Sequence, residues 1–467
     1  MNIAILIPVE LNGSSFSYWS ALLEELISYD KCNIYLIVAN NKSKHYIKNE
    51  VKSSSINVFN VLTDININTY SENERLNITN IHSDYWLPRA KLQLSTYHGT
   101  VFDSKSDFND IFCSYTFEIM NYLKCNNIEL LCLGVWNGFD FPGFSLIESV
   151  CNHLKLTTFV AERHGLRLGI YDNSLRRSFN IRRIFQKKIQ NGLTDIERNV
   201  VLQYCEYNAK NFNSINRKVD LEKIAFFSFL KNSISKYLKN LINKTNSDYD
   251  DFDVNKKYVL FLPSKYNNFR MNTLVPFCNN ASIVKSIYAS LPVGYSLIVK
   301  DHPHSYSRGV VDIEMVKAIK SYSNCYYVDP VLNTDDFVQN SEIVFTMAST
   351  SMWTPLIRFK HIVVFGDPPF LFDEDFNIAK VVSKMELLPS VIRECIGSSP
   401  PIHNMMVFLH SFIKTTLNLE GGESVDVKHN INRQRIFYSY GVLINRYINE
   451  VGRNNQKKQS SSNTNFF

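Results

Sequence analysis

Apolar residues in the first third of the chain occur in short runs separated by stretches of helical periodicity. Short apolar runs bounded by polar loops are typical of buried strands. They lie here at residues 2–9, 33–38, 57–67, 129–135 and 157–160. Helical spacing recurs from Trp19 to Ile27 and again over 144–153. Strands that alternate with helices predict a parallel sheet covered by helices, that is, an α/β domain over residues 1–175.

The pattern becomes mainly helical after residue 175, as in Phe229 to Ile242, and residues 245–253 are polar and acidic like a linker. A second series of strands is predicted at 258–262, 295–300, 325–328, 343–346 and 361–365, with helices at 279–291, 311–321, 334–340 and 351–359. We therefore expect a basic helical connector and acidic linker over 176–253 and a second α/β domain over 254–420. A helical segment over 421–451 and a disordered tail over 452–467 should follow.

The net charge of +6 is modest, but six cations fall in one stretch with no acid among them. They are Arg176, Arg177, Arg182, Arg183, Lys187 and Lys188. Such a stretch is either the solvated face of a helix or a surface for anionic lipid or anionic glycan. No recognised nucleic-acid-binding motif accompanies the charge, so no nucleic-acid partner is expected.

Cysteine usage and hydropathy bear on the compartment. The nine cysteines form no CxxC pair and no metal-ligand spacing, which suits a reducing cytoplasm. The first apolar run lacks a basic flank and breaks at Pro8 and Glu10, so it is predicted to be a strand and not a signal peptide. No apolar run reaches the roughly 18 residues of a membrane span. We expect a cytoplasmic protein, with peripheral contact to the inner face of the plasma membrane through the basic stretch.

The first segment with candidate chemistry is Lys300-Asp301-His302-Pro303, directly after a predicted strand. Ligands of open α/β sheets bind at the carboxyl ends of strands, so Lys300 and His302 would face a cleft. A cation beside an imidazole suits a phosphate. The alternative is a surface strand end closed by a turn-forming proline.

The second segment runs from Thr346 to Ser351, between a predicted strand and a predicted helix. Hydroxyls and free backbone N–H groups at a helix N-terminus can bind an anion. The alternative is an ordinary N-cap formed by Ser349 or Thr350.

Four segments between Phe261 and Gly366, taken together, resemble the bacterial capsule polysaccharide synthesis proteins, a family that includes Kdo transferases using CMP-Kdo. Their order and spacing are similar to those of the family. They are 261–266 (FLPSKY) with Arg270 and Thr273, 291–292 (LP) leading to 299–303 (VKDHP), 327–330 (YVDP), and 349–353 (STSMW) leading to 361–366 (HIVVFG).

This resemblance implies a GT-B glycosyltransferase fold, in which two Rossmann-like domains face each other across a cleft, here with a helical connecting segment. It implies that Lys300 and His302 contact the donor phosphate or cytidine, and it assigns the phosphate to Ser349, Thr350 and Ser351. Similar His-Pro and Ser/Thr motifs hold the CMP moiety in bacterial sialyltransferases. Lys265 and Pro303 belong to the implied donor site by the same resemblance.

Two positions depart from the family's pattern. The family usually has an acid near the position of Arg270, and it commonly has a Glu after the tryptophan, where this chain has Thr354. Such an acid could hold a ribose hydroxyl, so the departures concern the identity of the nucleotide and the activity itself.

The catalytic candidates in the first domain are Glu162, His164 and Asp172. Glycosyl transfer needs a carboxylate or imidazole that takes the proton of the acceptor hydroxyl or attacks the anomeric carbon. The family has a similar acid–glycine segment facing the donor domain. The alternative for Glu162 is an ion pair with Arg163 at a strand end. The segment Trp136-Asn137-Gly138 with Asp140 is either an acceptor-sugar loop or an ordinary turn.

No metal and no cofactor are expected. Asp251-Phe252-Asp253 has a DxD-like spacing but lies in the linker, and Asp335-Asp336 begins a predicted helix. A cationic donor site can neutralise the leaving phosphate without a metal.

The sequence thus predicts a glycosyltransferase of surface polysaccharide synthesis, of the capsular or lipopolysaccharide type. Its donor would be a nucleotide-sugar such as CMP-Kdo, and its acceptor a polysaccharide or lipid-linked glycan. The alternatives are a CDP-polyol phosphate transferase and a non-catalytic relative that binds glycan or partner proteins.

Overall fold

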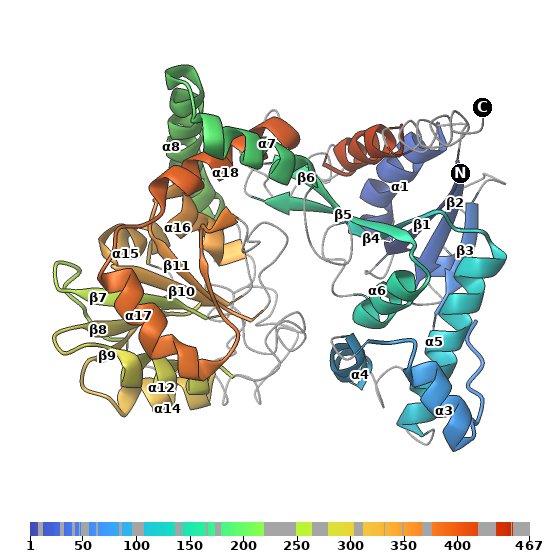
Figure 1. Ribbon diagram of the computed structural model, residues 1–467, viewed down its shortest axis with the longest axis horizontal. Coiled ribbons are helices and arrows are strands. Elements are labelled where there is room, and N and C mark those ends of the chain that lie inside the picture. Colours follow the sequence, from blue (N-terminus) through green and yellow to red (C-terminus); the bar gives the residue numbers. More distant parts are fainter. Residues whose placement is uncertain are drawn as a thin grey trace, which may run out of the picture. The chain divides into compact units, whose positions relative to one another are not determined.

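Contacts along the chain divide it into two units, of which the first is discontinuous (Figure 1). The first unit comprises residues 1–163, 167–178 and 416–467, and the second comprises 164–166 and 179–415. The computed structural model describes residues 1–7, 13–28, 32–39, 43–45, 47, 56–61, 64–83, 86–95, 107–135, 141, 143–164, 167–172, 179–218, 249–263, 279–302, 312–330, 332–347, 350–366, 376–418, 436–449 and 451.

The first unit is built on a sheet with strand order β13-β6-β5-β4-β1-β2-β3. Its strands are β1 (Asn2–Ile7), β2 (Asn33–Val38), β3 (Ile56–Asn60), β4 (Leu130–Val135), β5 (Thr157–His164), β6 (Arg167–Asp172) and β13 (Leu417–Asn418). The pairs from β3 to β5 are parallel, and β13 runs antiparallel to β6. Because the chain extends the sheet to one side through β2 and β3 and then to the other through β4 and β5, the parallel part has a Rossmann-like order.

Helices cover both faces of this sheet. They are α1 (Gly13–Ile27), α3 (Glu72–Thr79), α4 (Trp86–Ser95), α5 (Phe108–Cys125), α6 (Phe144–His153) and a helix over 436–449. Tyr122 of α5 stacks on Phe59 of β3, with 4.3 Å between ring centroids. A capping box fixes the start of α3, since Ser71 and Glu74 bond each other's backbone N–H groups.

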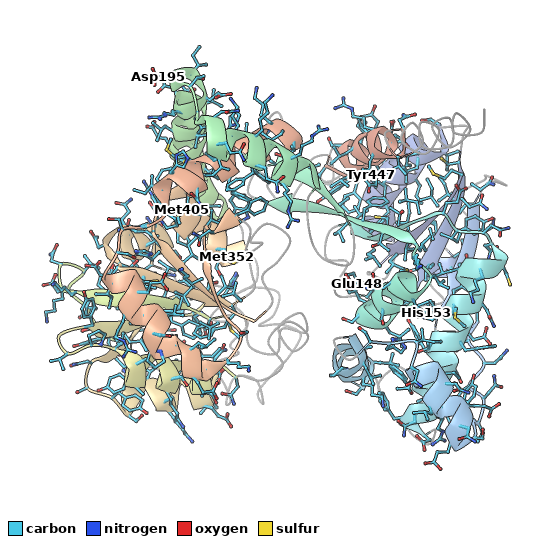
Figure 2. The ribbon with its side chains drawn as sticks, viewed as in Figure 1. Glu148, His153, Asp195, Met352, Met405 and Tyr447 are labelled. Atoms are coloured by element: carbon cyan, nitrogen blue, oxygen red, sulfur yellow. The ribbon has the colours of Figure 1, made fainter. Side chains whose placement is uncertain are left out.

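The helix over 436–449 completes the core on the α1 side of the sheet. Its buried residues Phe437, Tyr440 and Ile444 join the same apolar cluster as Trp19 of α1. Tyr447, labelled in Figure 2, places its ring 4.9 Å from that of Phe159 on β5. Residues that are remote in sequence therefore share one core.

The second unit holds a six-stranded sheet in the order β12-β11-β10-β7-β8-β9. Its strands are β7 (Tyr258–Leu262), β8 (Ser296–Lys300), β9 (Cys325–Val328), β10 (Ile343–Met347), β11 (His361–Phe365) and β12 (Lys380–Val382). All five pairings are parallel. Both faces are buried, as expected of a parallel sheet: Val259 and Phe261 face one apolar cluster, whereas Tyr258 and Leu260 face another.

Helices lie on both faces of the second sheet as well (Figure 1). α12 (Asn280–Ser290), α14 (Ile313–Lys320) and α17 (Leu388–Ile396) contribute to the Phe261 cluster. On the other face, α15 (Thr334–Asn340) contributes Phe337 and Val338. The acidic linker closes the sheet edge, because the backbone N–H of Asp250 donates to the Tyr327 carbonyl at 2.8 Å and the Asp250 carboxylate accepts from the Tyr327 N–H at 2.8 Å.

Three further helices of the second unit pack together. They are α7 (Phe179–Asn191), α8 (Asp195–Lys218) and α18 (Ile402–Thr415). α18 packs on both α7 and α8. Lys188 of α7 and Glu197 of α8 are joined by an ion pair of 2.6 Å. That lysine, together with the Thr194 N–H, lowers the pKa of Glu197 to about 2. The described cations of the basic stretch therefore lie on α7, a helix of the second unit.

These elements confirm the predicted α/β class with two Rossmann-like units. The predicted cleft between the units stays a prediction. Three local expectations were wrong in extent. The strand expected over 57–67 is β3, which ends at Asn60, and the strand expected to end at Val160 continues as β5 to His164. The helix expected over 351–359 is a 3-10 turn, η2 (Thr350–Met352), followed by the five-residue α16 (Trp353–Ile357).

Candidate functional site

The second sheet changes direction at β7, and this determines where a ligand can bind. The chain adds β8 and β9 on one side of β7, then returns to add β10, β11 and β12 on the other. In open parallel sheets the crevice outside the carboxyl ends at such a switch point binds the ligand. The strands around it end at Leu262, Lys300 and Met347. Both sequence segments with candidate chemistry therefore lie at this edge, on either side of β7.

The segment after β8 presents only one of its three described polar side chains to solvent. Lys300 is 2% exposed, and its ammonium donates to the Pro330 carbonyl over 2.8 Å. Asp301 is 4% exposed and accepts from the His302 N–H at 2.6 Å. His302 is exposed. Lys300 thus differs from the cleft-facing cation that the sequence suggested, because its position on the strand directs it into the fold.

The end of β10 and the turn η2 (Thr350–Met352) place two hydroxyl groups together. Thr346 is fully buried, and its hydroxyl donates to the Met347 carbonyl at 3.0 Å. The Ser351 hydroxyl is hydrogen-bonded to that of Thr346. The Thr346–Ser351 hydrogen bond holds η2 against the end of β10. The last residue of η2 is Met352, which is labelled in Figure 2.

The short helix α16 is anchored in the core. Trp353 is buried and lies 4.8 Å from the ring of Phe412 on α18. Thr354, which stands where the family commonly has a Glu, is 5% exposed. A helix of only five residues has little macrodipole, so an anion at this edge would depend on hydroxyl and N–H groups.

Several predicted site residues lie outside the described part of the structure. They are Lys265, Arg270, Thr273, Pro303, Ser349 and the loop 136–140, together with the side chain of Thr350. For Glu162, His164 and Asp172 the backbone is described but the side chains are not.

The backbone around the catalytic candidates differs from the expected strand end. Glu162 and His164 lie on β5, and Asp172 is the last residue of β6. Only residues 165 and 166 separate these neighbouring strands, and only antiparallel strands can be joined by so short a connection. β6 was not predicted from the sequence, because its alternation of apolar and polar residues is short and interrupted by Gly169.

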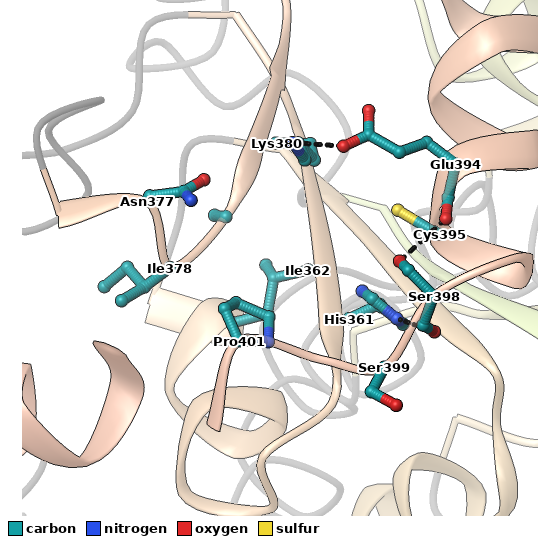
Figure 3. Close-up of a pocket in the computed structure, with 11 residues that line it drawn as sticks. His361, Ile362, Asn377, Ile378, Lys380, Glu394, Cys395, Ser398, Ser399 and Pro401 are labelled. Carbon is teal, nitrogen blue, oxygen red and sulfur yellow. Dashed lines mark hydrogen bonds and ion pairs between the residues drawn. The ribbon is translucent and has the colours of Figure 1, made fainter. Parts of the chain in front are cut away.

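A pocket of about 140 Å³ lies elsewhere in the second unit (Figure 3). It is lined by His361, Asn377, Lys380, Glu394, Ser398 and neighbouring residues. His361 and Lys380 begin β11 and β12, so the pocket lies at the amino ends of these strands. The Lys380–Glu394 ion pair of 2.6 Å and the bond between His361 Nε2 and the Ser398 carbonyl occupy its polar groups. It is therefore distinct from the candidate site.

The described ranges hold no cluster of three or more His, Cys, Asp or Glu that could bind a metal ion. One aspartate of each acidic pair noted in the sequence accepts hydrogen bonds from other residues of the protein. Asp335 is held by Arg358 and Gln339, and Asp253 accepts from the N–H of Asn255.

The basic stretch is divided between paired and exposed cations. Lys188 pairs with Glu197, whereas Arg183 and Lys187 are exposed on α7. Arg176 and Arg177 fall outside the described ranges. Among the described helices, none is both long and apolar enough to cross a membrane.

The two sheets define an α/β protein whose second Rossmann-like unit carries polar side chains at the carboxyl edge of its switch point. No protein-family model and no curated protein matches the chain. Among solved structures it is similar to KpsC of Thermosulfurimonas dismutans, a beta Kdo 2,7 transferase, with 12% identity over 70% of this chain and 89% of that one and a TM-score of 0.35.

Two other solved structures cover more of the chain. A glycosyltransferase from Rickettsia africae is 9% identical over 95% of this chain and 98% of its own, with a TM-score of 0.29. UDP-GlcNAc 2-epimerase from Methanocaldococcus jannaschii is 13% identical over 89% of this chain and 98% of its own, also with a TM-score of 0.29. At these TM-scores the similarities add nothing to what the two sheets show, so the function is argued from the site.

Proposed function

We propose that this chain is a glycosyltransferase of surface polysaccharide synthesis, of the capsular or lipopolysaccharide type. It transfers a sugar from a nucleotide donor to a polysaccharide or lipid-linked acceptor, and CMP-Kdo or another CMP-sugar is the candidate donor. One observation carries the proposal. Exposed His302 after β8 and the Thr346–Ser351 hydroxyl pair after β10 lie on either side of β7, at the edge where such sheets bind nucleotides.

The donor edge supplies what a nucleotide leaving group needs. When the bond to the anomeric carbon breaks, the departing phosphate must be stabilised by positive charge or hydrogen-bond donors. His302 can donate to its oxygens, and the Ser351 hydroxyl can do so by turning from Thr346 to the phosphate. The Lys300 ammonium is buried and bonds the Pro330 carbonyl, so its part in the donor site would be to fix the end of β8. Lys265, Pro303, Ser349 and Thr350 complete the proposed donor site.

A residue of β5 or β6 supplies the group that activates the acceptor. Glu162 is the first candidate, and His164 and Asp172 are the others. Such a group takes the proton of the acceptor hydroxyl while that oxygen attacks the anomeric carbon, or attacks this carbon itself to form a glycosyl-enzyme intermediate. The protein would act in the cytoplasm at the inner face of the plasma membrane, where a lipid-linked acceptor is found.

Titration of the protein with CMP tests the donor site. Replacing His302 by Ala should abolish binding while the thermal unfolding curve stays unchanged. His403→Ala is the matched control, because His403 is an exposed histidine on α18 of the same unit. Equal CMP affinity in wild type and His302→Ala would remove His302 from the site.

A hydrolysis assay with CMP-, CDP- and UDP-linked compounds separates the enzyme classes. Release of CMP from a CMP-sugar supports the proposal, and turnover of CDP-linked polyols alone would indicate a polyol-phosphate transferase. Binding without turnover of any donor would indicate a non-catalytic relative. The buried Thr354 at the position of the family's acid is the observation that favours this last alternative.

A further inference from the structure

The two residues that precede His302 at the end of β8 are both tied to β9 or to the residues shortly after it. On the amino side, Lys300 Nζ donates to the Pro330 carbonyl at 2.8 Å. On the carboxyl side of Lys300, Asp301 Oδ2 accepts from the Tyr327 hydroxyl at 3.4 Å. Its other oxygen, Oδ1, accepts from the His302 N–H at 2.6 Å. The Asp301 carboxylate therefore connects the His302 backbone to the Tyr327 side chain.

This connection is buried, which makes it costly to break. Asp301 is 4% exposed and Tyr327 is 1% exposed. A carboxylate removed from water is destabilising unless hydrogen-bond donors surround it. Burial raises the pKa of Tyr327 well above its usual value, and the negative charge of Asp301 raises it further. The hydroxyl thus remains protonated and is a permanent donor to Asp301.

The anchor of the connection is itself fixed. Asp250 accepts from the Tyr327 N–H and donates its own N–H to the Tyr327 carbonyl, both at 2.8 Å. Lys320 of α14 holds the Asp250 carboxylate at 2.6 Å. Tyr327 also pairs in register with Val299 of β8. The backbone position of Tyr327, and with it the position of its hydroxyl, is therefore determined by β8, by Asp250 and, through Asp250, by α14.

We infer that Asp301 and Tyr327 form a positioning pair that holds His302 in its orientation at the donor edge. The inference rests on the proposed function, in which His302 contacts the donor. An exposed side chain binds a phosphate well only when the residues behind it limit its movement. Asp301 limits the movement of His302 by bonding its backbone N–H, and the Tyr327 hydroxyl holds the Asp301 carboxylate in place. Lys300 holds the turn at Pro330 and is a second, independent restraint on the same strand end.

The His302 ring signals, observed by NMR on histidine-labelled protein and assigned with His302→Ala, test the positioning directly. Tyr327→Phe removes the hydroxyl and keeps the ring, and Asp301→Asn removes the charge at nearly constant size. Both variants should shift or broaden the His302 signals. Tyr326→Phe is the matched control, because Tyr326 is the adjacent tyrosine of β9 and packs on Phe252 instead. Unchanged His302 signals in both Tyr327→Phe and Asp301→Asn would overturn the inference.

CMP affinity gives the second readout. The Tyr327–Asp301 bond is long, at 3.4 Å, and acts on the donor only through His302. Tyr327→Phe should therefore weaken CMP binding by about two- to tenfold, and Tyr326→Phe should not. If His302→Ala weakens binding and Tyr327→Phe does not, the positioning pair is refuted. If the His302 signals move in Tyr327→Phe but even His302→Ala binds CMP normally, the pair stands and the donor role of His302 is wrong.

Discussion

Gly143 lies directly against the ring of Tyr115, so closely that a Cβ added at Gly143 would be 2.8 Å from Tyr115 Cε1. Gly143 also has a φ of 74° and precedes the first residue of α6. Both the left-handed backbone and the close approach require glycine here. The packing of α5 on α6 in the first unit therefore depends on the absence of a side chain at this position.

The first prediction is that Gly143→Ala lowers the free energy of unfolding by about 2–4 kcal/mol, from backbone strain and overpacking together. Gly294→Ala is the control, because Gly294 has a φ of 89° but open space around its Cβ position. It should lose only the strain contribution of about 1 kcal/mol. Chemical denaturation of both variants gives the comparison, and equal losses would contradict the role of Tyr115.

The second prediction concerns acid sensitivity of the first unit. His82 is 4% exposed, with Nδ1 2.8 Å from the Ser149 hydroxyl and Nε2 3.1 Å from that of Thr116. Burial, aided by the positive charges of His153 and Lys91, lowers the pKa of His82 from 6.5 to about 4. Because the folded pKa is depressed, the neutral ring stabilises the fold above pH 6.5. That stability is lost as the pH falls from 6.5 towards 4.

Unfolding free energies measured between pH 7 and pH 4 should therefore fall more steeply in wild type than in His82→Gln. The difference between the two slopes should accumulate to no more than about 3 kcal/mol. His403→Gln, at an exposed histidine of α18 in the second unit, should follow the wild-type curve closely. Parallel pH curves for wild type and His82→Gln would show that His82 is not the group responsible.

The third prediction concerns the catalytic candidate on β5. Glu162→Gln keeps the shape of the side chain and removes its charge, so turnover should fall by roughly 10²-fold or more, the usual loss for a general base. CMP affinity should change little, because the donor edge belongs to the second unit. Normal turnover in Glu162→Gln together with a loss in Asp172→Asn would transfer the role to Asp172.

The fourth prediction concerns membrane association through α7. Arg183 and Lys187 are exposed there, and each basic side chain near an anionic surface contributes about 1 kcal/mol. Flotation with phosphatidylserine vesicles should show salt-sensitive binding that the double replacement Arg183→Glu, Lys187→Glu removes. Replacing Lys124 and Lys155 of the first unit by Glu changes the net charge equally and should have little effect. Binding that persists in high salt would rule out this electrostatic mode.

The sheet strands were predictable where apolar runs had clear boundaries. The strands from Tyr258, Cys325 and His361 were predicted almost to the residue, because buried parallel strands give continuous apolar sequences. β12 and β13 were missed, since runs of three and two residues carry no periodicity.

For the candidate site, the sequence predicted only which segments lie at strand ends. The sequence indicated that Lys300 and His302 lie at a strand end, but their different exposures depend on the neighbouring strand. No local pattern shows that Lys300 bonds to Pro330 or that Asp301 accepts from Tyr327. Tyr327 could be noticed from sequence only as an aromatic strand residue, since its role arises from the register of β9 against β8.

The first unit is assembled from separate segments of the chain, and this has a consequence for its folding during synthesis. Residues 436–449 enter its core beside Trp19, yet the ribosome synthesises them only after the whole of residues 179–415. Domains generally fold as units during synthesis, so the second unit can reach its native state while the first still exposes the apolar face of α1. A ribosome stalled before Ile436 should therefore leave a folded second unit attached to a first unit whose α1 face is still exposed to aggregation.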